Sequence, residues 1–226
     1  MSKSINNSFD VKYAPKTLQE VVIADLATEV ELQRYVSGET RNPIILYGPY
    51  GTGKTTLAML MPGALSGRTL IEPVKHHPDV LFLNPADGLT QKQRLEQIQV
   101  RLRYTPAALR MRFFIFDELD LLGREVISCV KSYLDRGQEQ AIFIATTNSL
   151  SALEGGHKSR STRLHIVPAP LHRWKPRIEH ILDAEGVPVP EDEVLEDMLK
   201  LSKGDHRQFL SELQRYTEDV QQVAAE

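Results

Sequence analysis

The run from Leu46 to Leu60, LYGPYGTGKTTLAML, restricts the fold of this chain more than any other segment. It continues an apolar stretch, passes through a glycine cluster, and ends in Lys-Thr-Thr before a helix-compatible sequence. Gly48 to Thr55 matches the pattern G-x-x-x-x-G-K-[ST] at every fixed position. Glycines there let the backbone curve so that N–H groups meet phosphate oxygens at close range. The segment therefore predicts a phosphate-binding loop between a buried strand and a helix.

The residues of this loop point to a nucleoside triphosphate with Mg²⁺, and we expect ATP. A helix starting near Lys54 would place the positive end of its dipole at the phosphates. Lys54 is predicted to reach the β- and γ-phosphates, and the Thr55 hydroxyl to ligate Mg²⁺. A glycine-rich turn with no ligand is the alternative, and the flanking strand and helix disfavour it. The residues expected to bind nucleotide here are Gly48, Pro49, Tyr50, Gly51, Thr52, Gly53, Lys54, Thr55 and Thr56.

A second apolar run, RFFIFDELDLL from Arg112 to Leu122, ends in Asp117-Glu118. A carboxylate at the carboxyl end of a neighbouring parallel strand lies beside a phosphate loop, so Asp117 is predicted to hold Mg²⁺, through water. Glu118 is then placed to polarise an attacking water as general base. The alternative is a strand followed by a solvated loop. The adjacent acids favour hydrolysis over phosphoryl transfer, for which no acceptor site is evident.

Short apolar runs separated by helical patterns predict an α/β fold with a parallel five-stranded sheet and helices on both faces, as in P-loop NTPases. Most of these runs are continuous apolar stretches of four to six residues, which is typical of strands covered on both sides. The predicted strands are NPIILYG, DVLFLN, RFFIFD, AIFIATT and RLHIV. Helices are expected at 90–103 and 125–134.

The pattern changes after VPAPL, where three amphipathic helical faces follow in succession. Breaks at EGVPVPED and SKGD separate them. We therefore expect two domains, an α/β nucleotide-binding domain at 1–168 and a small three-helix lid domain at 169–226. The apolar residues of the three faces are Trp174, Ile178 and Ile181; Val194, Met198 and Leu201; Phe209, Leu213, Tyr216 and Val220.

The composition is that of an ordinary folded domain, with 41% hydrophobic and 25% charged residues among 226. The single cysteine, Cys129, excludes an internal disulfide and a multi-thiolate metal site. No stretch has the apolar length of a signal peptide or a bilayer span. These features lead us to expect a soluble, cytoplasmic protein with no membrane partner.

A basic island lies within this chain of net charge −3, because residues 92–112 hold six Lys and Arg against one Glu. Such an island can attract phosphate locally. An ordinary solvated helix face is the equally weighted alternative. The candidate contacts to DNA phosphates are Lys92, Arg94, Arg101 and Arg103.

Several of these motifs together resemble the AAA+ ATPases, and within them the sliding-clamp loader subunits of the replication factor C type. KYAPKTLQEVV, residues 12–22, is similar to the opening segment of that family, and HPDVLFLNP, DELDLL and FIATTN follow at its spacing. The resemblance implies that Tyr13, Pro15 and Val22 lie against adenine. It also implies that Asn148 is the polar residue between the loop and the γ-phosphate.

Two further segments carry the resemblance towards the carboxyl end. HKSRSTRLHIVPAPL resembles the segment that holds the arginine finger of clamp loaders, which implies that Arg160 acts in trans on a neighbouring subunit; Arg163 is a rival for this role. KGDHRQFLSEL resembles the second sensor helix, which implies that Arg207 contacts the bound nucleotide.

The resemblance implies an ATP-hydrolysing subunit that loads a sliding clamp onto primer-template DNA during replication. It would work in an oligomeric ring or spiral with other loader subunits, and its basic helix would track double-stranded DNA through the phosphate backbone. The chain ends about where the lid would end, so we expect a compact, phage-type loader without the collar domain. A helicase loader or another DNA-remodelling AAA+ ATPase is the first alternative, and a non-hydrolysing nucleotide-binding scaffold subunit is the second.

Overall fold

The computed structural model describes residues 8–68, 70, 74–136, 141–153 and 161–224. The described part of the chain divides into two compact units. We call residues 27–48 and 54–166 the sheet unit, and residues 8–26, 49–53 and 167–224 the helical unit. The boundary at 166–167 lies close to the predicted division after residue 168.

The sheet unit contains one five-stranded sheet in which every neighbouring pair is parallel, in the order β2-β3-β4-β1-β5. The predicted parallel sheet is confirmed; the first four predicted runs each contain one strand, and β5 begins at Thr162, one residue before the predicted run at 163–167. The strands are β1 (Ile44–Tyr47), β2 (Val80–Leu83), β3 (Arg112–Phe116), β4 (Ala141–Thr147) and β5 (Thr162–His165). The central strands β1, β3 and β4 are buried on both faces almost throughout, as their continuous apolar sequences predict.

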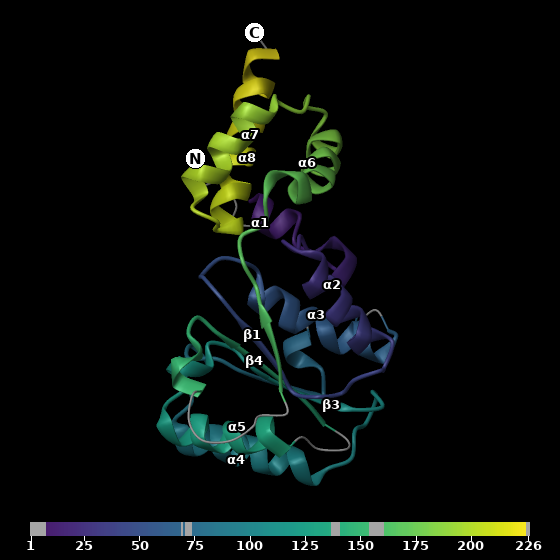
Figure 1. Cartoon of the computed structure of the whole chain (residues 1–226), viewed down its shortest axis with the longest axis vertical. Helices are drawn as coiled ribbons and strands as arrows, with labels where there is room; N and C mark the ends of the chain where they lie inside the picture. The colour runs from purple at the N-terminus through teal and green to yellow at the C-terminus, as the bar shows by residue number, and fades with distance from the viewer. Residues whose placement is uncertain (1–7, 69, 71–73, 137–140, 154–160, 225–226) are drawn as a thin grey trace. The chain divides into compact units, whose positions relative to one another are not determined.

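Helices of the sheet unit lie on both faces of the sheet (Figure 1). α3 contacts β1, β3 and β4 on one face, whereas α4 and α5 pack against each other on the other. Thr90 begins α4 with a capping box, because its hydroxyl accepts from the Gln93 N–H while the Gln93 side chain accepts from the Thr90 N–H. The helices are α2 (Leu26–Val36), α3 (Lys54–Ser66), η3 (Val74–His76), α4 (Gln91–Arg103), η4 (Leu119–Leu121), α5 (Arg124–Arg136) and η5 (Leu150–Leu153).

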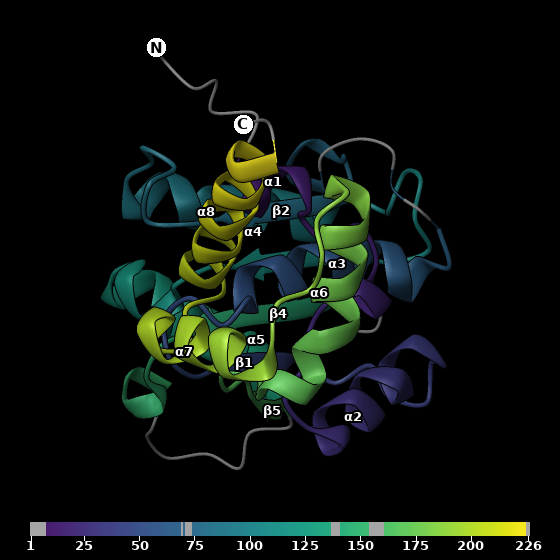
Figure 2. The ribbon, with the colours of Figure 1, turned by 90° about the horizontal axis from the view of Figure 1, so that it is seen from above.

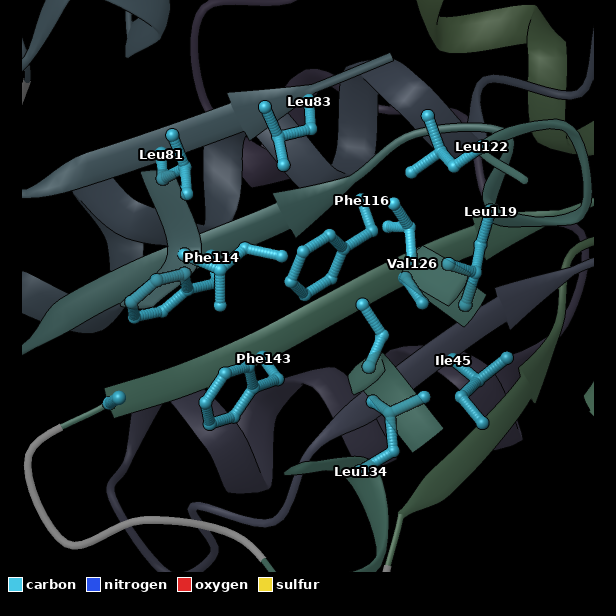
Figure 3. Close-up of a cluster of buried hydrophobic side chains, with 14 residues drawn as sticks. Ile45, Leu81, Leu83, Phe114, Phe116, Leu119, Leu122, Val126, Leu134 and Phe143 are labelled. Carbon is cyan, nitrogen blue, oxygen red and sulfur yellow. The ribbon is translucent and has the colours of Figure 1, made fainter. Parts of the chain in front are cut away.

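The core between the sheet and the helices α4 and α5 is built from alternate strand residues (Figure 3). Phe114 and Phe143 stack with ring centroids 5.0 Å apart, and Val126 and Leu134 of α5 belong to the same buried cluster. Burial of this apolar surface fixes the register of the strands, because a slip by one residue would turn the other face inward. The register in turn determines which side chains meet at the carboxyl edge of the sheet.

The helical unit contains α1 (Phe9–Lys12), η2 (Leu18–Glu20), α6 (Leu171–Glu185), α7 (Asp192–Ser202) and α8 (His206–Ala224). The three predicted C-terminal helices are present, and α8 lies beside both α7 and α1 (Figure 2). Trp174, Ile178 and Ile181 of α6 share a core with Phe209 and Leu213 of α8. Within the described residues no helix is both long enough and apolar enough to cross a membrane.

The N-terminal segment, residues 8–26, packs with the helical unit, which differs from the predicted domain of residues 1–168. Glu185 of α6 accepts from the Lys12 ammonium at 2.6 Å and from the Tyr13 hydroxyl. Arg177 donates to the Tyr13 carbonyl at 2.6 Å. These side-chain contacts are long-range in sequence, so the apolar periodicity of the chain does not reveal them.

Candidate active site

The glycines of the predicted phosphate loop occupy backbone conformations that other residues rarely adopt. Their φ angles are 145° at Gly48, 75° at Gly51 and 84° at Gly53. A β-carbon at Gly48 would lie 2.1 Å from the Ile166 carbonyl oxygen, so this position also lacks room for a side chain. The loop therefore requires glycine because of its positive φ angles and, at Gly48, because there is no room for a side chain.

The tip of the loop, residues 49–53, belongs to the helical unit and packs against the start of α8. The His206 N–H donates to the Gly51 carbonyl at 2.9 Å. A β-carbon at Gly51 would lie 2.4 Å from Oδ2 of Asp205. The loop tip and the first turn of α8 are thus joined by a backbone hydrogen bond and a close side-chain approach.

Lys54 is the first residue of α3, and its side chain is buried. Its Nζ donates to the Gly48 carbonyl at 2.9 Å, which closes the loop upon itself. Burial lowers the pKa of Lys54, and the carboxylates of Asp117, Asp120 and Glu118 oppose this shift. The structure therefore positions a buried amine at the phosphate loop and surrounds it with acidic groups.

Thr55 and Asp117 form a direct hydroxyl–carboxylate pair, in which Thr55 Oγ1 donates to Asp117 Oδ1 at 2.6 Å. Asp117 follows β3 and is buried. Both groups are hard oxygen donors of the kind that Mg²⁺ prefers, so the residues present fit this cation. Among the described residues no group of three or more His, Cys, Asp or Glu could hold a metal.

Glu118 has a left-handed backbone, with φ 48° and ψ 53°. Such a conformation is uncommon for a residue with a side chain and tends to occur at functional sites. The Glu118 N–H donates to Thr146 Oγ1 at 2.9 Å. The predicted base therefore lies directly after the predicted Mg²⁺ ligand, on a backbone that a neighbouring strand holds.

Asn148 follows the carboxyl end of β4, at the same edge of the sheet as Asp117. Its Nδ2 atom is buried and has no hydrogen-bond partner among the described residues. A buried amide donor without a partner is costly and commonly meets a ligand or water. This atom is consistent with the predicted role of Asn148 towards a phosphate oxygen, which stays a prediction.

Arg207 lies in the first turn of α8, and its side chain is exposed. Asp205 caps this helix, because its Oδ1 accepts from the N–H groups of Arg207 at 2.8 Å and Gln208 at 3.2 Å. Gly204 has a φ of 83° and lies against Pro168. The Gly204-Asp205 pair therefore has a structural function in the turn and cap that precede α8.

The residues predicted to lie against adenine are part of the helical unit. Tyr13 is buried, meets Phe9 edge to face at 5.1 Å, and donates its hydroxyl to Glu185. Pro15 and Val22 are half-buried, and Val22 packs on the same core. The Tyr13 side chain is thus a core residue, and contact of this segment with a base stays a prediction.

The prediction that Arg94 binds DNA needs correction. Arg94 is buried, and its guanidinium donates to both carboxylate oxygens of Asp87, with the shortest distance 2.6 Å. It also donates to the carbonyls of Asn84 and Pro85. Arg94 therefore fixes the connection between β2 and α4, and this burial removes it from the solvated face on which a phosphate backbone could lie.

The other basic residues of α4 remain at least partly accessible. Lys92 and Arg103 are exposed, whereas Arg101 is half-buried and donates to the Pro78 carbonyl. Of the two candidate arginine fingers, Arg160 lies outside the described residues. Arg163 lies in β5 opposite Ile45, and its side chain is exposed.

Residues 44–168 match the sequence model of the AAA family, which is described as the ATPase family associated with various cellular activities. The match covers more than half of the chain and includes the loop, Asp117-Glu118 and Asn148. The chain belongs to the AAA family. The predicted ATPase fold is thereby confirmed.

Curated relatives of this AAA chain include replication factor C subunits. It is 27% identical over 204 residues to replication factor C small subunit 2 of Pyrobaculum arsenaticum, covering 90% of this chain and 61% of that protein. It is 28% identical over 209 residues to replication factor C subunit 4 of Caenorhabditis elegans, covering 90% and 60%. The chain thus spans about 60% of the length of these relatives. Its resemblance to replication factor C small subunits is confirmed.

Among solved structures, the RuvB Holliday junction branch migration motor of Thermotoga maritima superimposes with a TM-score of 0.65 at 20% identity. The match covers 94% of this chain and 67% of RuvB. A likeness at this identity concerns the fold alone.

Sequence reasoning missed Thr146, which contacts both acidic residues of this AAA site. Its Oγ1 donates to Asp117 Oδ1 at 2.8 Å and accepts from the Glu118 N–H. It also missed His206, the first residue of α8, whose N–H donates to the loop tip at Gly51. A polar pair at the buried end of a central strand was the available signal for Thr146, since Thr146 and Thr147 follow five apolar residues in β4.

Proposed function

We propose that this chain is an ATP-hydrolysing subunit of a sliding-clamp loader that acts on primer-template DNA. The observation that carries the proposal is the pairing of Thr55 with Asp117 at 2.6 Å beside a loop closed by Lys54. Similarity to replication factor C subunits over 90% of the chain supports the choice of clamp loading among AAA functions.

The site residues divide the binding of Mg-ATP between them. The ammonium group of Lys54 binds the β- and γ-phosphates. Such a charge-assisted hydrogen bond is stronger in a buried environment than in water. Thr55 and Asp117 hold Mg²⁺, which neutralises charge on the phosphates when it is bound. The backbone N–H groups of the loop meet the remaining oxygens.

Glu118 accepts the proton of the attacking water, and Asn148 donates to a phosphate oxygen through the buried Nδ2 atom. The half-buried place of Glu118 and its held backbone support this assignment. Asn148 has the donor that such a contact needs. Hydrolysis therefore combines a base and a donor from the ends of two neighbouring strands.

Completion of the site requires arginines from the helical unit and from another subunit. Arg207 contacts the phosphates from the first turn of α8, and Arg160 or Arg163 reaches the γ-phosphate of a neighbour. A guanidinium at that position meets charge that develops in the transition state. The chain then hydrolyses ATP efficiently only within an oligomeric ring or spiral.

DNA is held through phosphates by Lys92, Arg101 and Arg103 of α4, without base readout. The exposed side chains of Lys92 and Arg103 support this placement. Such contacts follow the backbone of any duplex, which suits a loader that acts at primer ends of varied sequence.

The decisive experiment measures ATP turnover by the chain with its loader partners, with and without the sliding clamp and primed DNA. We expect turnover to rise when clamp and DNA are both present. Stimulation by a replicative helicase but not by the clamp would favour a helicase loader. Turnover that does not change on Glu118→Gln substitution would favour a nucleotide-binding scaffold.

A further inference from the structure

Thr146 contacts both acidic groups of the site through one hydroxyl. The hydroxyl donates its single hydrogen to Asp117 Oδ1 at 2.8 Å and accepts from the Glu118 N–H at 2.9 Å. The two bonds use different parts of the same oxygen, so together they define the side-chain rotamer. One residue of β4 thus links a side chain and a backbone group that both follow β3.

The strand register explains this meeting. Phe116 is paired with Ala145 in the parallel pair β3–β4, and the next residues along are Asp117 and Thr146. Thr146 is only 1% exposed, so water does not compete for its hydroxyl. Hydrogen bonds in such low-dielectric surroundings are stronger than at the surface.

The backbone of Glu118 needs such support. Its left-handed conformation is held on one side by the bond from its N–H to Thr146 and on the other by the bond from the Leu121 N–H to its carbonyl at 2.8 Å. A strained conformation persists when surrounding contacts fix it. Removal of the Thr146 hydroxyl would release one of these two contacts.

We propose that Thr146 is a positioning residue for ATP hydrolysis, an inference that rests on the proposed ATPase function. It acts through Asp117 on the affinity for Mg²⁺ and through Glu118 on the placement of the base. Thr146 itself contacts neither the nucleotide nor the water.

The adjacent Thr147 offers a matched control. It has the same burial as Thr146, at 1% exposed, and lies on the same strand. Its hydroxyl bonds instead to Asp120 Oδ1 and to the Ser149 carbonyl, each at 2.8 Å. Thr147→Val therefore removes an equally buried hydroxyl without touching Asp117 or Glu118.

The test compares Thr146→Val, Thr146→Ser and Thr147→Val with the wild-type chain. The Mg²⁺ concentration for half-maximal binding of a fluorescent ATP analogue is measured first, and kcat and KM for ATP second. For Thr146→Val we expect the half-saturating Mg²⁺ to rise and kcat to fall, each by about tenfold or more, as for other partners of metal ligands. We expect Thr146→Ser and Thr147→Val to stay within about threefold of wild type, because both keep the hydroxyl at 146.

The outcomes separate this inference from the proposed function. If the wild-type chain hydrolyses ATP and Thr146→Val changes neither the half-saturating Mg²⁺ concentration nor kcat, the positioning role alone is overturned. The same holds if Thr147→Val has an effect equal to that of Thr146→Val. A wild-type chain that neither binds nor hydrolyses Mg-ATP overturns both. Thermal unfolding checks that each variant folds. If Thr146→Val does not fold, Thr146→Ala replaces it.

Discussion

The Thr55 hydroxyl donates to Asp117 Oδ1 across 2.6 Å, although the two residues lie 62 positions apart in the chain. One residue is in the first turn of α3 and the other follows β3. Parallel strands bring their carboxyl ends to one edge of the sheet, which is where ligands bind in open α/β folds. The pair therefore lies at the edge of the sheet where open α/β folds bind their ligands.

Lys54→Ala is expected to weaken ATP binding by roughly 10- to 100-fold, because it removes a charge-assisted contact to the phosphates. Lys131→Ala on α5 removes a lysine from the same unit and should leave binding unchanged. Calorimetric titration with Mg-ATP measures both affinities. Equal affinities for the two variants would show that Lys54 does not bind phosphate.

Glu118→Gln is expected to lower kcat by about 100-fold or more while leaving ATP affinity near that of wild type, because only the proton acceptor is lost. Single-turnover hydrolysis and equilibrium binding separate the two effects. Glu125→Gln, in the first turn of α5, is the matched control. A kcat that survives the change at Glu118 would contradict its role as the base and favour the nucleotide-binding scaffold.

Gly51→Ala is expected to destabilise the loop tip by about 1–2 kcal/mol for its positive φ alone, and further through contact with Asp205. Gly38→Ala has a similar φ of 80° but no atoms within 4 Å of the added carbon. The difference in free energy of unfolding between the two variants isolates the Asp205 contact. Identical losses would mean that the loop moves away from α8 without cost.

Arg94→Ala is expected to lower the free energy of unfolding by about 3 kcal/mol, because it leaves the Asp87 carboxylate half-buried without its partner. Urea denaturation measures this loss.

The double variant Lys92→Ala with Arg103→Ala, in contrast to Arg94→Ala, should fold normally and reduce the slope of log affinity for DNA against log salt by about 2. An unchanged slope in the double variant would show that Lys92 and Arg103 of α4 do not contact DNA phosphates.

His206 is expected to make the helical unit less stable in acid. Its Nε2 atom is buried, and burial lowers the pKa of the imidazole from 6.5 to about 4. The unfolded chain therefore binds a proton at a higher pH than the folded chain, so the associated stability is complete above about pH 6.5. It is lost as the pH falls towards 4, by at most about 3 kcal/mol. Chemical denaturation at several pH values should show this loss in wild type and a reduced loss in His206→Gln; parallel curves would contradict it.

The sheet was predictable because β1 to β4 lie in apolar runs of the kind found in strands covered on both faces, whereas in the edge strand β5 only Leu164 is buried. The meeting of Thr55 with Asp117 beside the loop was predictable because the loop pattern and the end of an apolar strand restrict both residue type and spacing. The roles of Lys54, Thr55 and Asp117 towards phosphate and Mg²⁺ stay predictions. The arrangement of these residues follows from the fold once the strands are assigned.

Arg94 and Thr146 show why other features were not predictable. Nothing in the local sequence distinguishes Arg94 from the exposed basic residues of α4, since its burial depends on Asp87 in the preceding loop. The contacts of Thr146 depend on the register between β3 and β4, which local periodicity does not reveal. The attachment of residues 8–26 to α6 and α8 depends likewise on contacts between distant side chains.

The most direct measurement is a crystal structure of the chain with Mg²⁺ and a slowly hydrolysed ATP analogue. The expected result is a triphosphate within Gly48–Thr55, with Lys54 at the β- and γ-phosphates and Mg²⁺ held by the Thr55 hydroxyl and, directly or through water, by Asp117. A nucleotide bound elsewhere, or a loop that stays closed by the bond from Lys54 to Gly48 at saturating analogue, would contradict the proposed function at its base.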